Sequence, residues 1–433
     1  MRDNKLHTPD GFKDFLPDSY WLKLKIERRV EEVFHRYGFA SVSSPMLEYI
    51  EVFEGKGSAP PKQMYRFLDQ EGDILALRSD MTPPIARMAA AHYSWDDAPL
   101  RFCYVENAFR RHESYKGKAG EFTEAGVELI GLNSPDADAE VIAIAIRSLL
   151  AAGLTEFRVD IGQAEFLRGI LEETGLPAED QAAVLRALAE RDWAAAERLA
   201  REKNISGAPG ETLSGLHKLI GGADVLRKMK PLTQNVKSLR AVEHLELLHE
   251  ILEDYGVSPY VVFDLSMTGH LDYYTGILFR GYCHGIGFSL LDGGRYDGLI
   301  ARYGPAFPAV GFAIKIDHLM SVLSGRTIDE PRKAADVLLA FTPSGRKMAL
   351  AAGDELRRQG LRVENSLAAL SKEDDLPDIM SYVRRKNIPG VLFFEDSVRV
   401  QIANAATGEI RSVTVEELLR ASHDSPERME GGS

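Results

Sequence analysis

Two adjacent tyrosines, Tyr273 and Tyr274, are the residues whose types most directly suggest ligand chemistry. Each offers an aromatic wall and a phenolic hydroxyl that can donate or accept a hydrogen bond. Such a pair suits a small heteroaromatic ligand, for example an imidazole. The alternative is structural, because adjacent aromatic residues on a strand often pack a core and also meet solvent. The pair therefore indicates a binding site only if other polar residues join it.

A double glycine, Gly293-Gly294, opens the segment Gly-Gly-Arg-Tyr-Asp-Gly-Leu at residues 293–299. Glycine has no Cβ, so a backbone can approach a ligand or another strand closely at these positions. A tight turn between strands is the other interpretation. Within the order of motifs described below, we favour a close approach to a ligand.

A helix near the N-terminus is the first element expected to support such a site. Apolar residues recur at helical spacing from Leu22 to Tyr37, and Gly38 stands where glycine commonly ends a helix. A short β-branched run then reaches Pro45. This order predicts a helix followed by a strand.

Residues from about 175 to 255 predict an inserted helical lobe. The stretch 178–202 is rich in Ala, Leu, Glu and Arg, and Pro177 stands where a helix can open. The stretch 232–255 carries an apolar stripe. Two roles are open for the lobe, which either packs over a sheet or takes part in partner docking or gating.

Beyond Pro331 the sequence predicts an independent unit. Apolar runs at residues 337–341 and 391–394 alternate with helical patterns at residues 344–359 and 378–386. A short strand is expected to open at Val363, and a hairpin to turn at Thr407-Gly408. The alternation predicts a small α/β domain over residues 335–421, and residues 422–433 are expected to form a flexible tail.

The composition is that of a globular protein with room for two or three domains. Of the 433 residues, 45% are hydrophobic and 27% are charged, and the formal net charge is −13. This acidic balance opposes the electrostatic footprint of a general nucleic-acid binder. Cys103 and Cys283 are too few and too distant for a disulfide scaffold, which favours a reducing compartment.

Neither a metal site nor a membrane segment is expected. His244 and His249 are five residues apart on a predicted helix and do not share a face, so they form no metal-ligand set. The polar N-terminus lacks a signal-peptide core, and no run approaches the roughly eighteen apolar residues of a membrane helix. We expect a cytoplasmic protein without a metal or a cofactor.

The order of motifs resembles that of histidyl-tRNA synthetases, which belong to class II of the aminoacyl-tRNA synthetases. Residues 8–17 resemble the opening segment of that family, and the helix, strand and Pro45 resemble the first class signature, which builds the subunit interface. Residues 268–276, Thr-Gly-His-Leu-Asp-Tyr-Tyr-Thr-Gly, resemble the histidine-recognition loop. Residues 293–299 match a further family signature. The resemblance implies a homodimer.

The same resemblance assigns roles to polar residues. Asp80 and Thr82 match a segment whose acid meets the α-amino group of the substrate, and an aspartate keeps that negative charge. Arg110 matches the arginine that contacts the α-phosphate and the substrate carboxylate. Glu128 matches the acid that faces the imidazole, and Glu124 replaces a glutamine that contacts the amino acid. The predicted histidine-binding residues are Asp80, Thr82, Arg110, Glu124, Glu128, Tyr273 and Tyr274.

Departures from the synthetase pattern fall on the groups that handle ATP. Gly269 and His270 stand where synthetases carry an Arg-Gly pair, and the loop at residues 111–120 lacks several of their arginines. In residues 311–319, His318 takes the place of an arginine that clamps the γ-phosphate, and Asp317 that of a glutamate. Each lost positive contact costs roughly 3 kcal/mol of transition-state stabilisation. We therefore expect no catalytic residues and no synthetase activity.

Synthetase-like chains without a working site are known as regulatory subunits of ATP phosphoribosyltransferase, and residues 77–87 and 121–131 resemble that family more closely. This resemblance implies an α+β fold over residues 1–330, with an antiparallel sheet flanked by helices and a helical insertion. A shortened anticodon-binding-like α/β domain is expected to follow. Residues 371–378 are acidic where that domain often has lysines, and a phosphate backbone repels carboxylates.

The implied function is that of a non-catalytic regulatory protein in histidine biosynthesis. It would bind histidine as effector, form a homodimer, and join a short-form catalytic phosphoribosyltransferase in a hetero-oligomer that passes on feedback inhibition. No tRNA partner is expected. The alternative is a divergent histidyl-tRNA synthetase or another amino-acid adenylating enzyme that compensates through Arg111, Lys118 or His318. A synthetase-like protein of an unrelated regulatory pathway would share the pocket but not the partner.

Overall fold

The structure is a computed structural model that describes residues 6–55, 60–111, 119–203, 205, 207–267, 273–324, 333–366 and 376–418. The chain divides into two compact units, Met1–Ile328 and Asp329–Ser433. Several segments that carried sequence predictions lie outside the described residues, namely residues 112–118, 268–272, 371–375 and 422–433.

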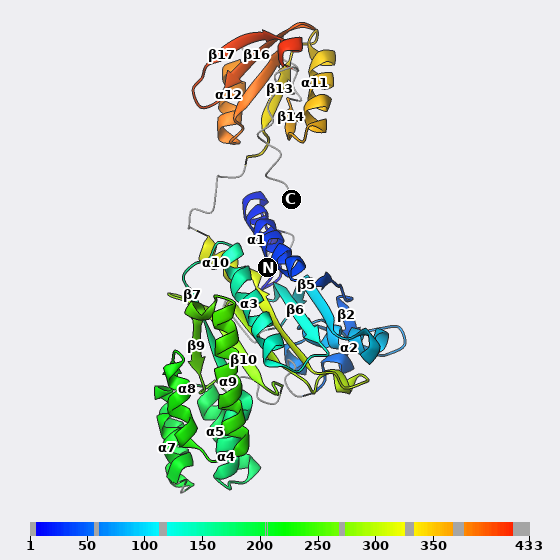
Figure 1. The fold of residues 1–433 in the computed structure, drawn as a ribbon. Helices are drawn as coiled ribbons and strands as arrows, with labels where there is room; N and C mark the ends of the chain where they lie inside the picture. The colour runs from blue at the N-terminus through cyan, green and yellow to red at the C-terminus, as the bar shows by residue number, and fades with distance from the viewer. Residues whose placement is uncertain are drawn as a thin grey trace. The chain divides into compact units, whose positions relative to one another are not determined.

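A large mixed sheet forms the centre of the first unit (Figure 1). Its strands are β1 (Ala40–Ser41), β5 (Leu100–Phe109), β6 (Glu121–Ile130), β7 (Phe157–Gln163), β8 (Ile220–Gly221), β9 (Val261–Asp264), β10 (Ile277–Cys283), β11 (Leu291–Arg295) and β12 (Ala309–Lys315). They are ordered β1-β5-β6-β12-β11-β10-β7-β9-β8 in a nine-stranded sheet. The pairs from β5 through to β7 are antiparallel, whereas β1 with β5 and β7 with β9 are parallel.

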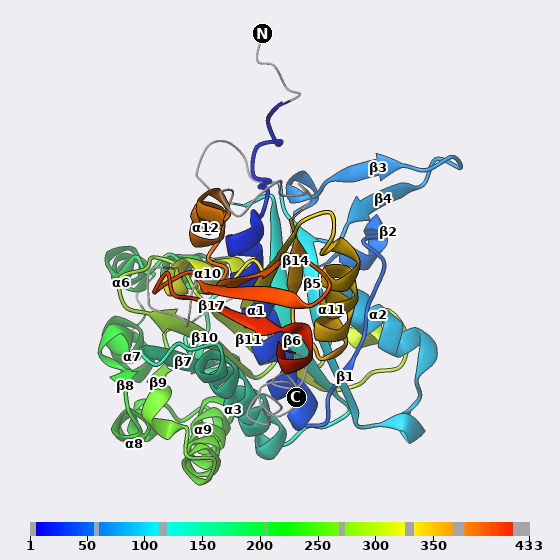
Figure 2. The same ribbon diagram turned by 90° about the horizontal axis from the view of Figure 1, so that it is seen from above.

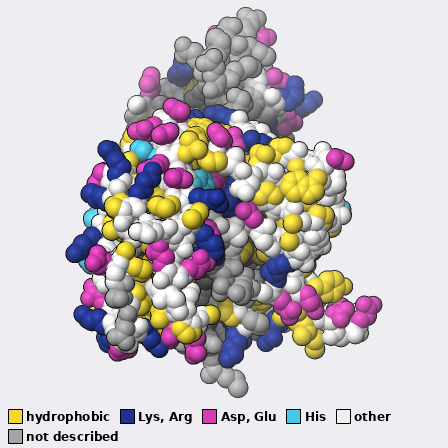
Figure 3. Space-filling view, turned by 60° about the horizontal axis from the view of Figure 1, so that its bottom comes forward, with side chains coloured by type: hydrophobic (Ala, Val, Ile, Leu, Met, Phe, Trp, Pro, Cys, Tyr) yellow, Lys and Arg dark blue, Asp and Glu magenta, His cyan; other side chains and the backbone are white. Residues whose placement is uncertain are grey.

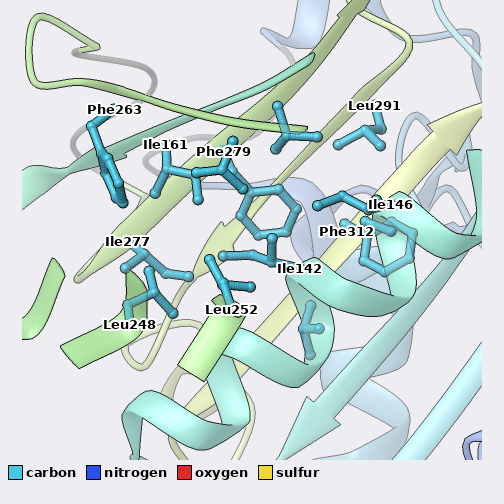
Figure 4. Packing of buried hydrophobic residues seen from close by; sticks show 14 of the residues in the cluster. Ile142, Ile146, Ile161, Leu248, Leu252, Phe263, Ile277, Phe279, Leu291 and Phe312 are labelled. Carbon is cyan, nitrogen blue, oxygen red and sulfur yellow. The ribbon is translucent and has the colours of Figure 1, made fainter. Parts of the chain in front are cut away.

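Three helices cover one face of this sheet: α1 (Pro17–Arg36), α3 (Pro135–Ala151) and α10 (Ile316–Leu323). Ile142 and Ile146 of α3 lie among the buried strand side chains Phe279 and Phe312 (Figure 4). Gly38, with φ of 77°, follows the end of α1, as predicted. Because side chains alternate along a strand, every second side chain of the central strands points to the sheet face that these three helices do not cover.

The helical lobe lies between β7 and β9 in the chain and beside the β7–β9 edge of the sheet in space (Figure 1). Its helices are α4 (Ala164–Glu173), α5 (Ala178–Ala189), α6 (Trp193–Glu202), α7 (Gly207–Gly215), α8 (Asp224–Met229) and α9 (Val236–Asp254). The lobe therefore begins at Ala164, earlier than the predicted residue 175. The helical stretch expected at residues 178–202 is broken, because Arg191 adopts a positive φ of 55° and Asp192 caps α6 through the Ala195 N–H.

A small antiparallel sheet consists of β2 (Leu47–Tyr49), β3 (Arg66–Leu68) and β4 (Ile74–Leu77), in the order β2-β4-β3. Figure 2 shows these strands projecting from the large sheet. Helix α2 (Thr82–His92) begins five residues after the last residue of β4. Ile85 and Ala89 of α2 pack against Leu100 and Phe102 of β5.

The second unit has a five-stranded sheet in the order β14-β13-β15-β16-β17. Its elements are β13 (Val337–Phe341), α11 (Arg346–Arg358), β14 (Val363–Asn365), α12 (Leu376–Arg385), β15 (Gly390–Phe394), β16 (Arg399–Asn404) and β17 (Ile410–Thr414). Leu338 packs with Val383 of α12, whereas the next residue, Leu339, packs with Leu356 of α11. The two helices therefore lie on opposite faces, which explains why the predicted strand at residues 337–341 is apolar throughout.

The surface of the described residues mixes charges of both signs. On the face shown in Figure 3, basic and acidic side chains are interspersed. None of the helices that the structure describes combines the length and apolar character needed to span a bilayer. Both cysteines, Cys103 and Cys283, are buried and free.

Candidate binding site

A cavity of about 240 Å³ opens on the sheet face opposite α1 and α3. In β6, Ala125 and Val127 point into the helix-covered core, so the alternate residues Glu124 and Glu128 point to the other side. The residues that line the cavity are Pro60, Gln63, Asp80, Thr82, Arg110, Glu124, Tyr273, Tyr274, Arg280, Asp292, Gly293, Tyr296, Gly311, Phe312, Ala313 and Lys315. All the residues predicted from the sequence line this cavity except Glu128, which lies directly behind it.

Glu128 forms part of the cavity wall through two hydrogen bonds. Its Oε1 accepts from the Thr82 hydroxyl at 2.8 Å, and its Oε2 accepts from the Tyr296 hydroxyl. Gly311 provides the space, since a Cβ there would lie 1.9 Å from Glu128 Oε2. Burial raises the pKa of Glu128 to about 8, although both hydroxyls oppose that rise. Burial therefore makes this carboxyl group harder to ionise than an exposed glutamate.

Glu124 differs from Glu128 because one of its oxygens lacks a protein partner. Its side chain is buried, and Oε2 has no hydrogen-bond partner within the described residues. Burial, and then the negative charge of Asp80, raise the pKa of Glu124 to about 7, while Arg110 and Lys315 act in the opposite direction. A buried, unsatisfied acceptor beside a cavity favours a ligand that brings a hydrogen-bond donor or a positive charge.

Asp80 and Arg110 form one wall of the cavity together. The Arg110 guanidinium donates to Ser79 O at 2.8 Å and contacts Asp80 Oδ2 at 3.1 Å. Asp80 Oδ1 accepts the Thr82 N–H at 3.0 Å, which fixes the carboxylate at the start of α2. Arg110 also lies over the Phe122 ring, 5.3 Å from its centroid. These contacts fix the orientations of the Asp80 carboxylate and the Arg110 guanidinium at the cavity.

The tyrosines expected to form an aromatic wall do so. The Tyr273 ring is edge-on to Tyr274, with centroids 5.0 Å apart, and is stacked with Tyr296 at 5.6 Å. Burial raises the pKa of Tyr273 far above its ordinary value, so its hydroxyl stays protonated. Both Gly293 and Gly294 lie within β11, so the tight-turn interpretation is wrong. A Cβ on Gly294 would lie 2.6 Å from the Tyr274 ring, and the glycine therefore makes room for that wall.

A charged group that sequence reasoning missed lies on the other side of the cavity. Asp292 bonds to Lys315 and lies 3.1 Å from the Arg280 guanidinium. Burial opposes ionisation of Asp292, but Lys315 and Arg280 outweigh it and lower its pKa. Arg280 and Asp292 are direct partners across β10 and β11, and each interrupts an apolar strand. That interruption was a usable signal, but their pairing depends on a strand register that the sequence does not state.

His318, the residue in place of a phosphate-clamping arginine, does not line the cavity. Its Nδ1 is 2.8 Å from Ser289 O, and its ring lies 4.1 Å from the ring of Phe288. Burial lowers its pKa, which disfavours a positive charge at that position. Asp317 accepts the Thr123 N–H at 2.9 Å and pairs with Lys13 at 2.7 Å. Gly269 and His270 lie outside the described residues, so the structure does not describe their neighbourhood.

The antiparallel strands β5, β6, β12, β11 and β10, with a polar cavity on one face, define a fold like that of the class II aminoacyl-tRNA synthetases. A family model described as histidyl-tRNA synthetase matches residues 11–319. A solved histidyl-tRNA synthetase from Nostoc sp. PCC 7120 has a TM-score of 0.82 at 22% identity, covering 96% of this chain and 99% of that one, which bears on the fold. The predicted fold class is confirmed.

Relatives that match this chain over nearly its whole length identify its family more specifically. The chain is 40% identical to the ATP phosphoribosyltransferase regulatory subunit of Acetivibrio thermocellus, over 97% of this chain and 100% of that one. The subunit of the same name in Ruminiclostridium cellulolyticum is 36% identical, over 96% and 98% of the two chains. A solved ATP phosphoribosyltransferase regulatory subunit/histidyl-tRNA synthetase from Bacillus halodurans C has a TM-score of 0.80 at 32% identity, covering 90% and 98%. The chain belongs to the family of ATP phosphoribosyltransferase regulatory subunits, which confirms the resemblance seen in its motifs.

Proposed function

We propose that this chain binds free histidine in the described cavity and thereby controls a separate, short-form catalytic ATP phosphoribosyltransferase that depends on it for activity. The observation that carries the proposal is the whole-length match to relatives named as regulatory subunits. The cavity supports it independently, because its groups suit an amino acid with an imidazole side chain. In this proposal the chain recognises histidine, and the catalytic partner carries out the phosphoribosyltransferase reaction.

Each part of histidine has a suitable partner in the cavity. Thr82 and Tyr296, whose hydroxyls donate to Glu128 behind the cavity, can accept an imidazole N–H, and Tyr273 with Tyr274 offers flat aromatic walls for the ring. Asp80 and Glu124 provide negative charge for the α-ammonium group. The α-carboxylate of histidine can pair with the cationic residues of the cavity, which are Arg110, Arg280 and Lys315. Acids and bases therefore both line the cavity, as binding of a zwitterion requires.

The pairing of two bases of the cavity argues against amino-acid adenylation. Lys315 and Arg280 both pair with Asp292, so their charges are already neutralised in part. We propose that the arginines needed for adenylation are lost, and that the site binds without turning over.

An exposed apolar sheet face supports the proposed homodimer. Tyr49, Leu75 and Phe67 are aligned across β2, β4 and β3, and Leu47 lies two residues before Tyr49 on the same face. Leu47, Tyr49 and Phe67 are 44%, 53% and 49% exposed. A contiguous apolar face of this kind marks an interaction site, and a second copy of the chain is the proposed occupant. The buried free cysteines accord with the proposed cytoplasmic location.

Two assays on the purified chain test the proposed function. Exchange of labelled pyrophosphate into ATP is measured with and without histidine, and we expect no histidine-dependent exchange. A short-form catalytic phosphoribosyltransferase is then assayed alone, with the chain, and with the chain plus histidine. We expect the chain to raise turnover and histidine to suppress it. Histidine-dependent exchange at ordinary enzymatic rates, or charging of tRNA by the chain, would instead support a divergent synthetase.

A further inference from the structure

The helical lobe reaches the wall of the histidine cavity through a small apolar cluster. Ala164, Met267 and Leu278 form this cluster, and both Leu185 of α5 and Tyr274 of the cavity pack against it. The Ala164 N–H, at the start of α4, also donates to Gly276 O at 2.9 Å. The lobe therefore contacts the chain segment that carries the aromatic wall.

Arg168 makes the most direct of these contacts. It lies on α4, and its guanidinium donates to the backbone carbonyl of Tyr274 at 3.0 Å. A second nitrogen of the same guanidinium pairs with Glu165, one turn earlier on the helix. The Glu165 contact limits the positions open to the arginine, and the hydrogen bond then fixes the main chain of Tyr274. Arg168 itself does not line the cavity.

A second arginine of the lobe holds the strand that precedes the same segment. Arg191, in the break between α5 and α6, lies 3.1 Å from Asp264 Oδ2. Asp264 is 1% exposed and ends β9, and it also accepts the Ser266 N–H at 2.9 Å. Asp160 of the neighbouring β7 is a second buried acid, which pairs with Arg158 of its own strand, whereas Asp264 pairs with Arg191 of the lobe. Met267, which belongs to the apolar cluster, lies three residues after Asp264.

We propose that the helical lobe sets the position of Tyr274 through Arg168, so that Arg168 is a positioning residue for the histidine site and the lobe responds to its occupation. The proposal rests on the proposed function only where histidine is used as the probe. If the Tyr274 backbone takes one position with the cavity filled and another with it empty, the hydrogen bond passes that difference to α4. The lobe would then link the ligand to the rest of the assembly.

The experiment compares the full-length wild-type chain with Arg168→Ala, Arg168→Lys and Arg186→Ala. Arg186 is an exposed residue of α5 and serves as the matched control. Hydrogen exchange is measured by mass spectrometry on the peptide covering residues 273–283, without ligand. We expect exchange on the order of tenfold faster in Arg168→Ala, a partial return in Arg168→Lys, and no change in the control. Equal exchange in all four proteins would overturn the positioning role.

The second measurement uses histidine as a ligand. It separates a positioning role of Arg168 from a general loss of stability, because a general loss of stability would not remove the effect of histidine on exchange in the lobe. We expect calorimetry to show roughly tenfold weaker histidine binding in Arg168→Ala, with the control unchanged. Histidine should slow exchange in residues 164–189 of the wild type but not of Arg168→Ala. If the wild type binds histidine and both effects are missing, the lobe is not linked to the site. If the wild type does not bind histidine, the proposed function fails, and ligand-free exchange still decides the role of Arg168.

Discussion

Replacing Glu124 with glutamine removes a buried carboxyl group whose ionisation costs stability in the absence of a ligand. Burial, and then the negative charge of Asp80, raise the pKa of Glu124 from an ordinary 4.5 to about 7. Since the folded state holds this proton more tightly, the cost is absent below pH 4.5, grows as the pH rises to about 7, and is complete above it. A neutral glutamine of similar shape does not carry this cost.

The size of the effect follows from the two pKa values. The difference between 4.5 and about 7, at about 1.4 kcal/mol for each factor of ten in proton affinity, gives about 3 kcal/mol. We therefore expect Glu124→Gln to be more stable than the wild type by about 3 kcal/mol at pH 8. At pH 4.5 the two proteins should differ little, because both side chains are then neutral.

Urea unfolding followed by tryptophan fluorescence measures this difference. The three tryptophans, Trp21, Trp95 and Trp193, all lie in the first unit, so the signal reports on the unit that contains Glu124. Each unfolding curve is recorded for the variant and the wild type from pH 4.5 to pH 8.5, and other titrating groups cancel in the difference. Glu179→Gln, which removes an exposed carboxylate from α5, is the matched control.

A stability difference between Glu124→Gln and the wild type that stays constant from pH 4.5 to pH 8.5 would refute the reasoning. The same holds if the variant loses stability as the pH rises, because the carboxylate would then be stabilised by groups of the fold. An equal rise in Glu179→Gln would show that any lost negative charge is enough, since the net charge is −13.

Three further perturbations follow from contacts in the first unit. Gly311→Ala should abolish histidine binding in calorimetry, because its Cβ would lie 2.5 Å from Val127 O and still closer to the buried carboxyl group of the cavity wall. Asp138→Ala should lower the urea-unfolding free energy by roughly 3–5 kcal/mol, since it leaves the buried Arg295 without its main partner. Tyr49→Glu should convert the proposed homodimer into monomers in analytical ultracentrifugation, because it places a charge on the exposed apolar face.

Each of these perturbations has a control within the same unit. Gly298→Ala adds a Cβ with no heavy atom within 4 Å, so it should keep histidine binding. Asp224→Ala removes an exposed ion pair with Lys228 on α8 and should leave the unfolding free energy almost unchanged. Val236→Glu places a charge on an exposed apolar residue of the helical lobe and should leave the dimer intact. A matching effect in any control would assign the result to general disruption.

The fold was largely predictable because its signals are local. Gly38 ends α1 with a positive φ, and the runs at residues 337–341 and 391–394 form strands that are buried on both faces. The break between α5 and α6 is less local. Arg191 adopts a positive φ there, which its residue type does not indicate, and it pairs with Asp264 from a distant strand.

Many of the residues that line the cavity were predictable from the sequence, but the balance of charge around it was not. Motif resemblance placed Asp80 and Glu124 together, and both line the cavity. Arg280, Asp292 and Lys315 were missed because they meet only when β10, β11 and β12 pair in register. That register makes one acid neutralise two bases, which changes what the cationic side of the cavity can bind.

The measurement that tests the central claim most directly is histidine inhibition of a short-form catalytic phosphoribosyltransferase reconstituted with this chain. The histidine concentration that halves turnover is compared for the wild type, Glu128→Gln and the exposed control Glu179→Gln. We predict that Glu128→Gln raises this concentration at least about tenfold, because it alters the buried carboxyl group that Thr82 and Tyr296 hold in the cavity wall, and that the control leaves it unchanged. Inhibition at the same histidine concentration in all three proteins would show that histidine acts elsewhere and would contradict the account.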